Sequence, residues 1–164
     1  MTRRAMIQKW ILYGLCALAL VLAEGLLLVR VEFWGVHPFL LPAIAVIPVT
    51  LERDEAALLF SVFFGLVCDL LSPVTGLPCF YTLAFLLSGA LAWLLSGRLV
   101  CSLAATAVSL AVCSLLHLAV LAGSQPVDAS AAAMLAGKEA LLSLPLTVLA
   151  HYPFRRVCLA TQRD

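Results

Sequence analysis

The sequence predicts an all-α membrane protein with six transmembrane helices, and three observations support this fold class. Hydrophobic residues make up 64% of the 164-residue chain, charged residues make up only 12%, and the mean hydropathy is +1.11. A soluble domain has about a quarter charged residues, so this chain has too little polar surface to face water on all sides. Apolar runs of bilayer-spanning length also recur along most of the sequence.

Six apolar segments account for nearly the whole chain. We expect membrane spans at 10–29, 36–51, 56–71, 79–96, 99–122 and 131–151, within one integral membrane domain over 1–164. The basic N-terminus resembles the start of a signal peptide, but the apolar run that follows is too long for a signal h-region, so we expect a retained first span. No loop between the spans is long enough for a soluble domain. Any function is therefore expected inside the bilayer or at its edge.

The second predicted span differs from the others in its prolines. It is short and contains Pro38, Pro42 and Pro48. Because proline lacks a backbone N–H and kinks helices, we expect this span to be irregular or partly re-entrant and shielded by its neighbours. The third span is also short and follows a compact charged turn at 52–55.

The basic residues predict the orientation. With a cytoplasmic N-terminus, eight of the ten fall on the inner side: Arg3, Arg4, Lys9, Arg53, Arg98, Arg155, Arg156 and Arg163. Arg30 lies in an outer loop and Lys138 lies within the last span. Inner loops of membrane proteins are enriched in lysine and arginine, so we expect both termini in the cytoplasm.

Ionisable residues within the spans are the first candidates for a functional site, because charge inside a bilayer is costly and needs a partner or a purpose. The predicted orientation places Glu24, Asp69, His117, Lys138 and Glu139 in the outer half of the bundle. We expect Glu24, Asp69, Lys138 and Glu139 to form an outer-half polar cluster in which Lys138 bridges the carboxylates.

Separate roles for these residues remain as alternatives. Each charge could reach the lipid headgroups alone, which is easy for lysine but difficult for the short Asp69. Asp69 could also be exposed at its helix end or hydrogen-bonded in the turn at 72–76. His117 is expected to be a core histidine. Adjacent Lys138 and Glu139 project about 100° apart on a helix, which favours a partner for Lys138 on another span.

Motifs for catalysis and metal binding are missing from the sequence. The six cysteines form no C-x-x-C pair and show no zinc-ligand spacing, and most lie in apolar spans, where cysteine behaves as a small hydrophobe. There is no H-E-x-x-H, G-x-S-x-G or glycine-rich phosphate loop. We therefore expect neither an enzyme nor a cofactor or metal site. The basic residues are scattered at loops rather than gathered on one face, so we also expect no nucleic-acid partner.

The segment around the third span resembles the rod shape-determining protein family MreD. The resemblance is carried by the proline-bearing second span, the short charged turn, the element Gly-Leu-x-x-Asp at 65–69, and Gly76 before the next apolar span. It implies that Gly65 and Gly76 allow close packing and a tight turn, and that Asp69 caps or pins the end of the third span.

The resemblance also implies a function. MreD-like proteins are non-enzymatic scaffold or regulatory subunits of the bacterial cell-elongation complex, in the inner (plasma) membrane. They pair with the bitopic protein MreC and act with the MreB cytoskeleton, and they influence peptidoglycan synthesis by RodA and its penicillin-binding transpeptidase. We expect the same role and partners for this chain.

A second class of protein shares the expected architecture. Substrate-binding S-components of energy-coupling-factor vitamin transporters are also small six-helix membrane proteins with a ligand pocket in the outer half. Aromatic and polar side chains near 72–76 and 124–128 are few, which favours the scaffold. A third possibility is an orphan small transporter or channel, but no inverted repeat is visible in the sequence.

Overall fold

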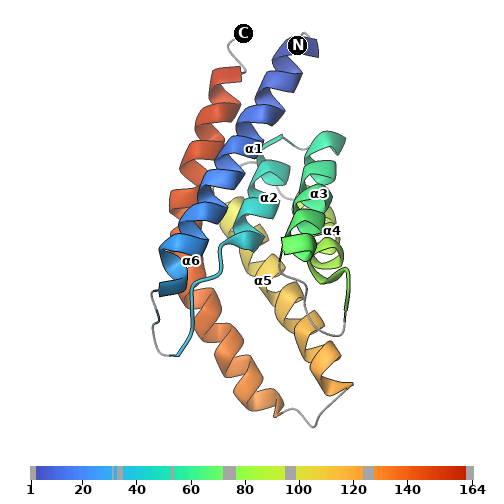
Figure 1. Cartoon of the computed structure of the whole chain (residues 1–164), viewed down its shortest axis with the longest axis vertical. Helices are drawn as coiled ribbons and strands as arrows, with labels where there is room; N and C mark the ends of the chain where they lie inside the picture. The colour runs from blue at the N-terminus through green and yellow to red at the C-terminus, as the bar shows by residue number, and fades with distance from the viewer. Residues whose placement is uncertain are drawn as a thin grey trace.

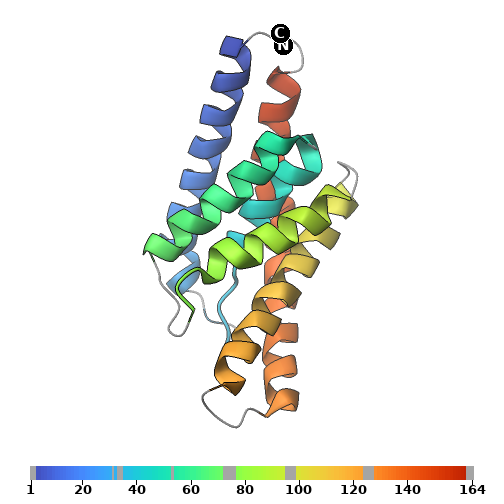
Figure 2. The same ribbon diagram turned by 90° about the vertical axis from the view of Figure 1, so that its right-hand side faces the viewer.

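The computed structural model describes residues 3–30, 32, 35–52, 54–71, 77–94, 99–123 and 128–161. These residues form six α-helices and one short 3-10 helix: α1 (Arg3–Leu26), η1 (Leu28–Arg30), α2 (Leu41–Glu52), α3 (Glu55–Leu71), α4 (Phe80–Trp93), α5 (Leu99–Ala122) and α6 (Ala129–Thr161). The all-α prediction with six helices is confirmed for this part of the chain. The long helices α1 and α6 run side by side, and both chain ends lie at the same end of the bundle (Figures 1 and 2).

Three of the helical stretches are long and apolar enough to cross a membrane: Met6–Leu26, Leu99–Val120 and Ser130–Thr161. Along α1, the side chains of Ile11, Leu15, Leu18 and Leu22 are all more than half exposed and recur at helical spacing. A stripe of this kind fits a surface in contact with lipid. The apolar helices α2 and α4 have only 12 and 14 residues. At 1.5 Å per residue they reach only about 18 and 21 Å, less than the hydrocarbon core of about 30 Å.

Helix α2 forms the centre of the bundle. Each residue from Pro42 to Thr50 is buried, and the helix contacts all five other α-helices. A helix that is apolar on all sides is stable only where neighbours surround it completely. The hydroxyl of Thr50 is satisfied locally, because it donates to the carbonyl oxygen of Ile47 at 2.8 Å.

The expected second span at 36–51 is wrong at its start. The helix begins at Leu41, and residues 37–40 lead into it without regular secondary structure. Pro38 disfavours helical geometry in the residue before it. Pro42 lies in the first turn of α2, where a missing N–H needs no helical partner. Pro38 therefore keeps the segment before α2 out of helical geometry, while Pro42 is compatible with the first turn of the helix.

The last helix is longer than the expected span at 131–151. Helix α6 has 33 residues and continues through Pro153 to Thr161. This extension packs Phe154 and Cys158 against α1, and the rings of Phe154 and Tyr13 lie 5.7 Å apart. The segment after the expected end of the span is therefore part of the bundle, because one of its faces is apolar. Smaller corrections apply to the first and fourth spans: α1 ends at Leu26 and α4 ends at Trp93.

Helix α6 begins with a side-chain cap outside its membrane-length stretch. Asp128 accepts hydrogen bonds from the backbone N–H and the hydroxyl of Ser130, at 3.0 and 2.7 Å. These hydrogen bonds favour the carboxylate form and lower the pKa of Asp128 below its usual range. Aspartate is among the preferred residues at this position of a helix.

Candidate functional site

Asp69, near the end of α3, caps the beginning of α4. Its carboxylate accepts three hydrogen bonds: from the backbone N–H of Tyr81 at 2.8 Å, from the backbone N–H of Thr82 at 2.8 Å, and from the hydroxyl of Thr82 at 2.7 Å. The N–H groups in the first turn of a helix have no partner within the helix. Cys79, at the N-cap position of α4, makes no side-chain cap. Asp69 supplies that cap from the preceding helix and places its negative charge at the positive end of the α4 dipole.

Gly65 makes this contact sterically possible. It lies one helical turn before Asp69 on the same face of α3. A Cβ atom at position 65 would lie 2.7 Å from the carbonyl oxygen of Tyr81 and 2.8 Å from the Cα of Thr82. No side chain fits at such distances without movement of the α4 backbone. Residues 65 and 69 therefore act together to join α3 to the first turn of α4, while Gly76 and the turn at 72–76 lie outside the described residues.

Glu24 of α1 plays a similar role for α2. Its Oε1 accepts a hydrogen bond from the backbone N–H of Leu40 at 3.0 Å, directly before the first residue of α2. The neighbouring N–H of Phe39 donates to the hydroxyl oxygen of Ser143 on α6 at 2.9 Å. The approach to α2 is thus held between α1 and α6. The side chain of Glu24 is 9% exposed, and its second oxygen, Oε2, is buried without a hydrogen-bond partner in the described part of the chain.

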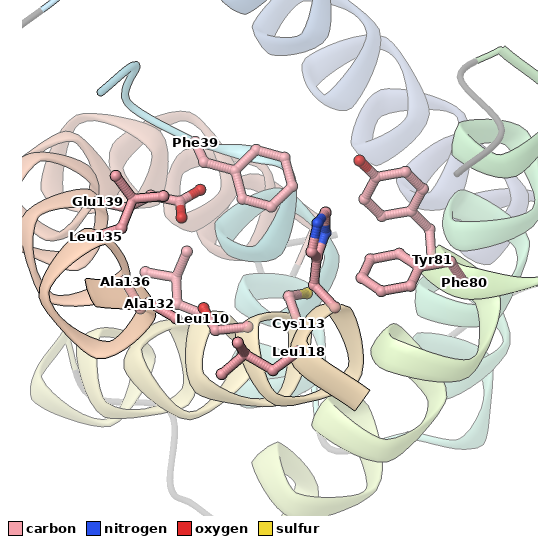
Figure 3. Close-up of a pocket in the computed structure, with 12 residues that line it drawn as sticks. Phe39, Phe80, Tyr81, Leu110, Cys113, Leu118, Ala132, Leu135, Ala136 and Glu139 are labelled. Atoms are coloured by element: carbon pink, nitrogen blue, oxygen red, sulfur yellow. The ribbon is translucent and has the colours of Figure 1, made fainter. Parts of the chain in front are cut away.

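A cavity of about 360 Å³ lies in the half of the bundle away from the chain termini, between α4, α5 and α6. We call it the far-end cavity, and its aromatic, polar and ionisable lining residues are Phe39, Phe80, Tyr81, Cys113, Ser114, His117 and Glu139. Figure 3 shows Glu139 reaching in from α6, with Phe80 and Tyr81 on the opposite side.

A second cavity of about 370 Å³ shares the residues Phe39, Leu135 and Glu139 with the first, and Glu24 and His37 also line it. We call this one the adjoining cavity. Glu139 is therefore exposed to both spaces. Two carboxylates of the expected polar cluster, Glu24 and Glu139, are brought to one cavity wall.

The expected bridge from Lys138 is not formed. Lys138 lines neither cavity, and the only ion pair among the described residues joins Lys9 to Glu52. The carboxylate of Asp69 already accepts hydrogen bonds from α4, so it does not need an ion pair with Lys138. Lys138 also projects about 100° away from Glu139, which faces the cavities. The expectation of a core histidine is wrong for His117: its side chain is exposed, lines the far-end cavity, and lies with its ring 6.2 Å from that of Phe80.

Sequence reasoning missed a cluster near the chain termini, formed by Lys9, Tyr13 and Glu52, which we call the terminal cluster. The ammonium group of Lys9 lies 2.8 Å from Oε2 of Glu52, and the hydroxyl of Tyr13 donates to Oε1 at 2.6 Å. The side chains of Lys9 and Glu52 are only 8% and 10% exposed. Both charges were expected in cytoplasmic flanks. The available signal was the spacing of Lys9 and Tyr13, which puts them on one face of α1.

Comparison with known proteins adds no family: no family model, no curated protein and no solved structure matches this chain. Within the described ranges, no group of three or more His, Cys, Asp or Glu side chains is placed to hold a metal ion. The arrangement of the site is therefore interpreted from its own geometry. It contains one carboxylate, Asp69, with hydrogen bonds to both of its oxygens, and two carboxylates, Glu24 and Glu139, that line a cavity.

Proposed function

We propose that this chain is a non-enzymatic scaffold subunit of the bacterial cell-elongation complex, similar to MreD and located in the inner membrane. The observation that supports this most is the junction built by Gly65 and Asp69. The element that carries the family resemblance has a defined mechanical use, since Gly65 admits the α4 backbone and Asp69 caps it. The three hydrogen bonds that Asp69 accepts from described residues all come from α4, which supports an architectural role.

The proposed topology has six crossings with both termini in the cytoplasm. The common location of the two chain ends in Figure 1 is consistent with an even number of crossings. Arg155 and Arg156 lie on exposed positions near the end of α6, where the inner membrane surface would attract them. The partners are an MreC-like bitopic protein and, through it, the MreB filament and the RodA–transpeptidase pair. They would bind through the exposed apolar helix faces, which hold leucines such as Leu15 and Leu22.

Affinity purification of the tagged full chain from its native membrane tests this function. We expect an MreC-like protein and wall synthases to copurify with it. An unrelated polytopic protein of similar size, carrying the same tag and purified in the same detergent, is the control. Recovery of the well-folded chain without any MreC-like protein would contradict the proposal.

The two cavities favour a second candidate function, that of a substrate-binding S-component of a vitamin transporter. Their volumes of about 360 and 370 Å³ lie in the range of small-molecule sites, of about 300 to 1,000 Å³. Their walls combine apolar surface with a few converging polar groups, as such sites do. The same purification distinguishes the two functions, because a transporter subunit would bring down energising ATPase subunits and a bound vitamin instead of wall synthases.

A further inference from the structure

The far-end cavity and the adjoining cavity share an excess of negative charge. Glu139 lies on the wall common to both, and Glu24 lines the adjoining cavity. None of the residues that line either cavity in the described part of the chain is a lysine or an arginine. The one ion pair among the described residues, Lys9 with Glu52, belongs to the terminal cluster. Among the described lining residues the only basic side chains are His37 and His117, so no permanent cation lies on the walls beside these two carboxylates.

Glu24 is an incompletely satisfied group beside this space. One of its oxygens is bonded to the N–H of Leu40, while Oε2 is buried and makes no hydrogen bond in the described residues. Leaving a buried carboxylate oxygen without a donor costs free energy. The side chain is about nine-tenths buried, so bulk water does not reach it freely. A bound donor with a positive charge would satisfy Oε2 and Glu139 from the same cavity wall.

Aromatic rings form the other side of the far-end cavity. The rings of Phe39 and Tyr81 lie 6.2 Å apart, and those of Phe80 and Tyr81 meet edge to face at 5.1 Å. Figure 3 shows Phe80 and Tyr81 across the cavity from Glu139, with the ring of Phe39 between them and Glu139. Aromatic faces attract organic cations and pack against apolar groups. Such a wall is poorly suited to a hydrated metal ion, which requires several oxygen or nitrogen ligands.

We propose that the cavities bind a small organic ammonium compound with an apolar body. Its ammonium group lies at the wall shared with Glu24 and Glu139, and its apolar body packs against Phe39, Phe80 and Tyr81. A volume of about 360 Å³ accommodates a compound with one ring. This inference does not rest on the scaffold function, and in a transporter subunit it would define the substrate class.

Calorimetric titration of the purified full chain in detergent tests the proposal with three matched probes. These are 2-phenylethylammonium, the neutral and nearly isosteric 2-phenylethanol, and the anion 3-phenylpropionate. We expect the ammonium to bind at least about tenfold more tightly than the alcohol, since its hydrogen bond to a carboxylate is between charged groups. We expect no binding of the anion.

Variants assign the binding to the cavity wall. Glu139→Gln should weaken ammonium binding by about tenfold or more and leave binding of the alcohol unchanged. Phe39→Leu should weaken it by about threefold through loss of one aromatic face. Asp128→Asn is the control, because it removes the same charge from the exposed start of α6, and it should bind like wild type.

Three results would overturn the proposal: equal affinity for the ammonium and the alcohol, wild-type affinity in Glu139→Gln, or no binding of the ammonium to a folded chain. If Glu139→Gln fails to fold, Phe39→Leu and the ratio between the probes still decide the question. These measurements use the isolated chain. Their failure would leave the scaffold function standing, and failure to copurify an MreC-like protein would leave this inference standing.

Discussion

The two ends of the bundle hold buried carboxylates under opposite conditions. In the terminal cluster, Glu52 is bonded to both Lys9 and Tyr13, and the side chains pack closely. At the far end, one oxygen of Glu24 has no hydrogen-bond partner among the described residues, and Glu139 borders two cavities. A buried glutamate is thus paired with a lysine at one end, whereas the glutamates at the other end line cavities.

Helix α2 explains much of this difference, because its two ends face the two carboxylates. Glu52 is the last residue of α2, where the helix dipole is negative and a second negative charge is unfavourable. Lys9 offsets it there. The side chain of Glu24, from α1, lies against the start of α2, where the helix dipole is positive and N–H groups need acceptors. A carboxylate at the start of α2 is therefore stabilised by the helix without a cation from the chain. It remains able to attract a cation from outside the chain.

The largest effect on stability is expected at the end of the bundle that holds the terminal cluster, which we call the closed end. Lys9→Met leaves the Glu52 carboxylate buried without its cation, and should lower the free energy of unfolding by about 3 to 5 kcal/mol. Unfolding of the detergent-solubilised chain by SDS measures this. Arg156→Met, which removes an exposed cation from the same end, is the control and should cost less than about 1 kcal/mol. Equal effects of the two substitutions would contradict the closed-end interpretation.

Asp69→Asn tests the cap at the far end. Asparagine keeps the shape but loses the charge and one acceptor, so two of the N–H groups of α4 compete for one oxygen. We expect a loss of about 1.5 to 3 kcal/mol, the usual contribution of a hydrogen bond to a charged group. Asp128→Asn is the matched control, since asparagine caps an exposed helix start about as well as aspartate. A chain with Asp69→Asn that is as stable as its control would show that Asp69 is not a cap.

Gly65→Ala tests the close approach of α3 and α4. Overpacking costs about 1 to 3 kcal/mol, and the better helix propensity of alanine returns up to about 1 kcal/mol, so we expect a net loss of about 1 to 2 kcal/mol. Gly14→Ala in α1 is the control, because a Cβ atom there meets nothing within 4 Å. That change should be neutral or slightly stabilising. The same thermal melt can score both variants, and a stabilised Gly65→Ala would be incompatible with the short contacts to Tyr81 and Thr82.

The smallest effect is expected for Glu24→Gln. Glutamine still offers an oxygen to the N–H of Leu40, and its amide can donate where Oε2 lacks a partner. Stability should therefore change by less than about 1 kcal/mol, in contrast to Asp69→Asn. A loss as large as that of Asp69→Asn, in parallel unfolding titrations, would mean that the charge of Glu24 is already compensated within the fold.

The sequence predicts the parts of this fold that depend on local pattern. Apolar run length predicts six helices, and the spacing of Gly65 and Asp69 places them on one face of α3. The family resemblance implied that Asp69 caps the end of the third span, but in the structure it caps the first turn of α4 instead. The start of α2 at Leu41 is harder to predict, because its first turn is satisfied by Glu24 on another helix. No local pattern encodes that partner.

The partners of the charges depend on packing between helices distant in sequence. Lys9 and Glu52 are 43 residues apart, and neither shows in sequence that it will be buried. Lys138 was expected to pair because it is an intramembrane cation, but its position on α6 turns it away from both cavities. The partner of a charged side chain thus depends on how its helix is rotated about the helix axis. The hydropathy of the sequence does not indicate that rotation.

Two cysteines allow the most direct test of the central claim, that the far end is open and the terminal end closed. Cys113 lines the far-end cavity and Cys158 lies at the closed end, and each is only 6% exposed. Variants retaining one of the two as their only cysteine would be treated with the cation 2-aminoethyl methanethiosulfonate and its anionic sulfonatoethyl analogue. We predict that Cys113 reacts, and faster with the cation, while Cys158 stays unmodified in the folded chain. Modification of Cys158 as fast as Cys113, or protection of both, would contradict the account.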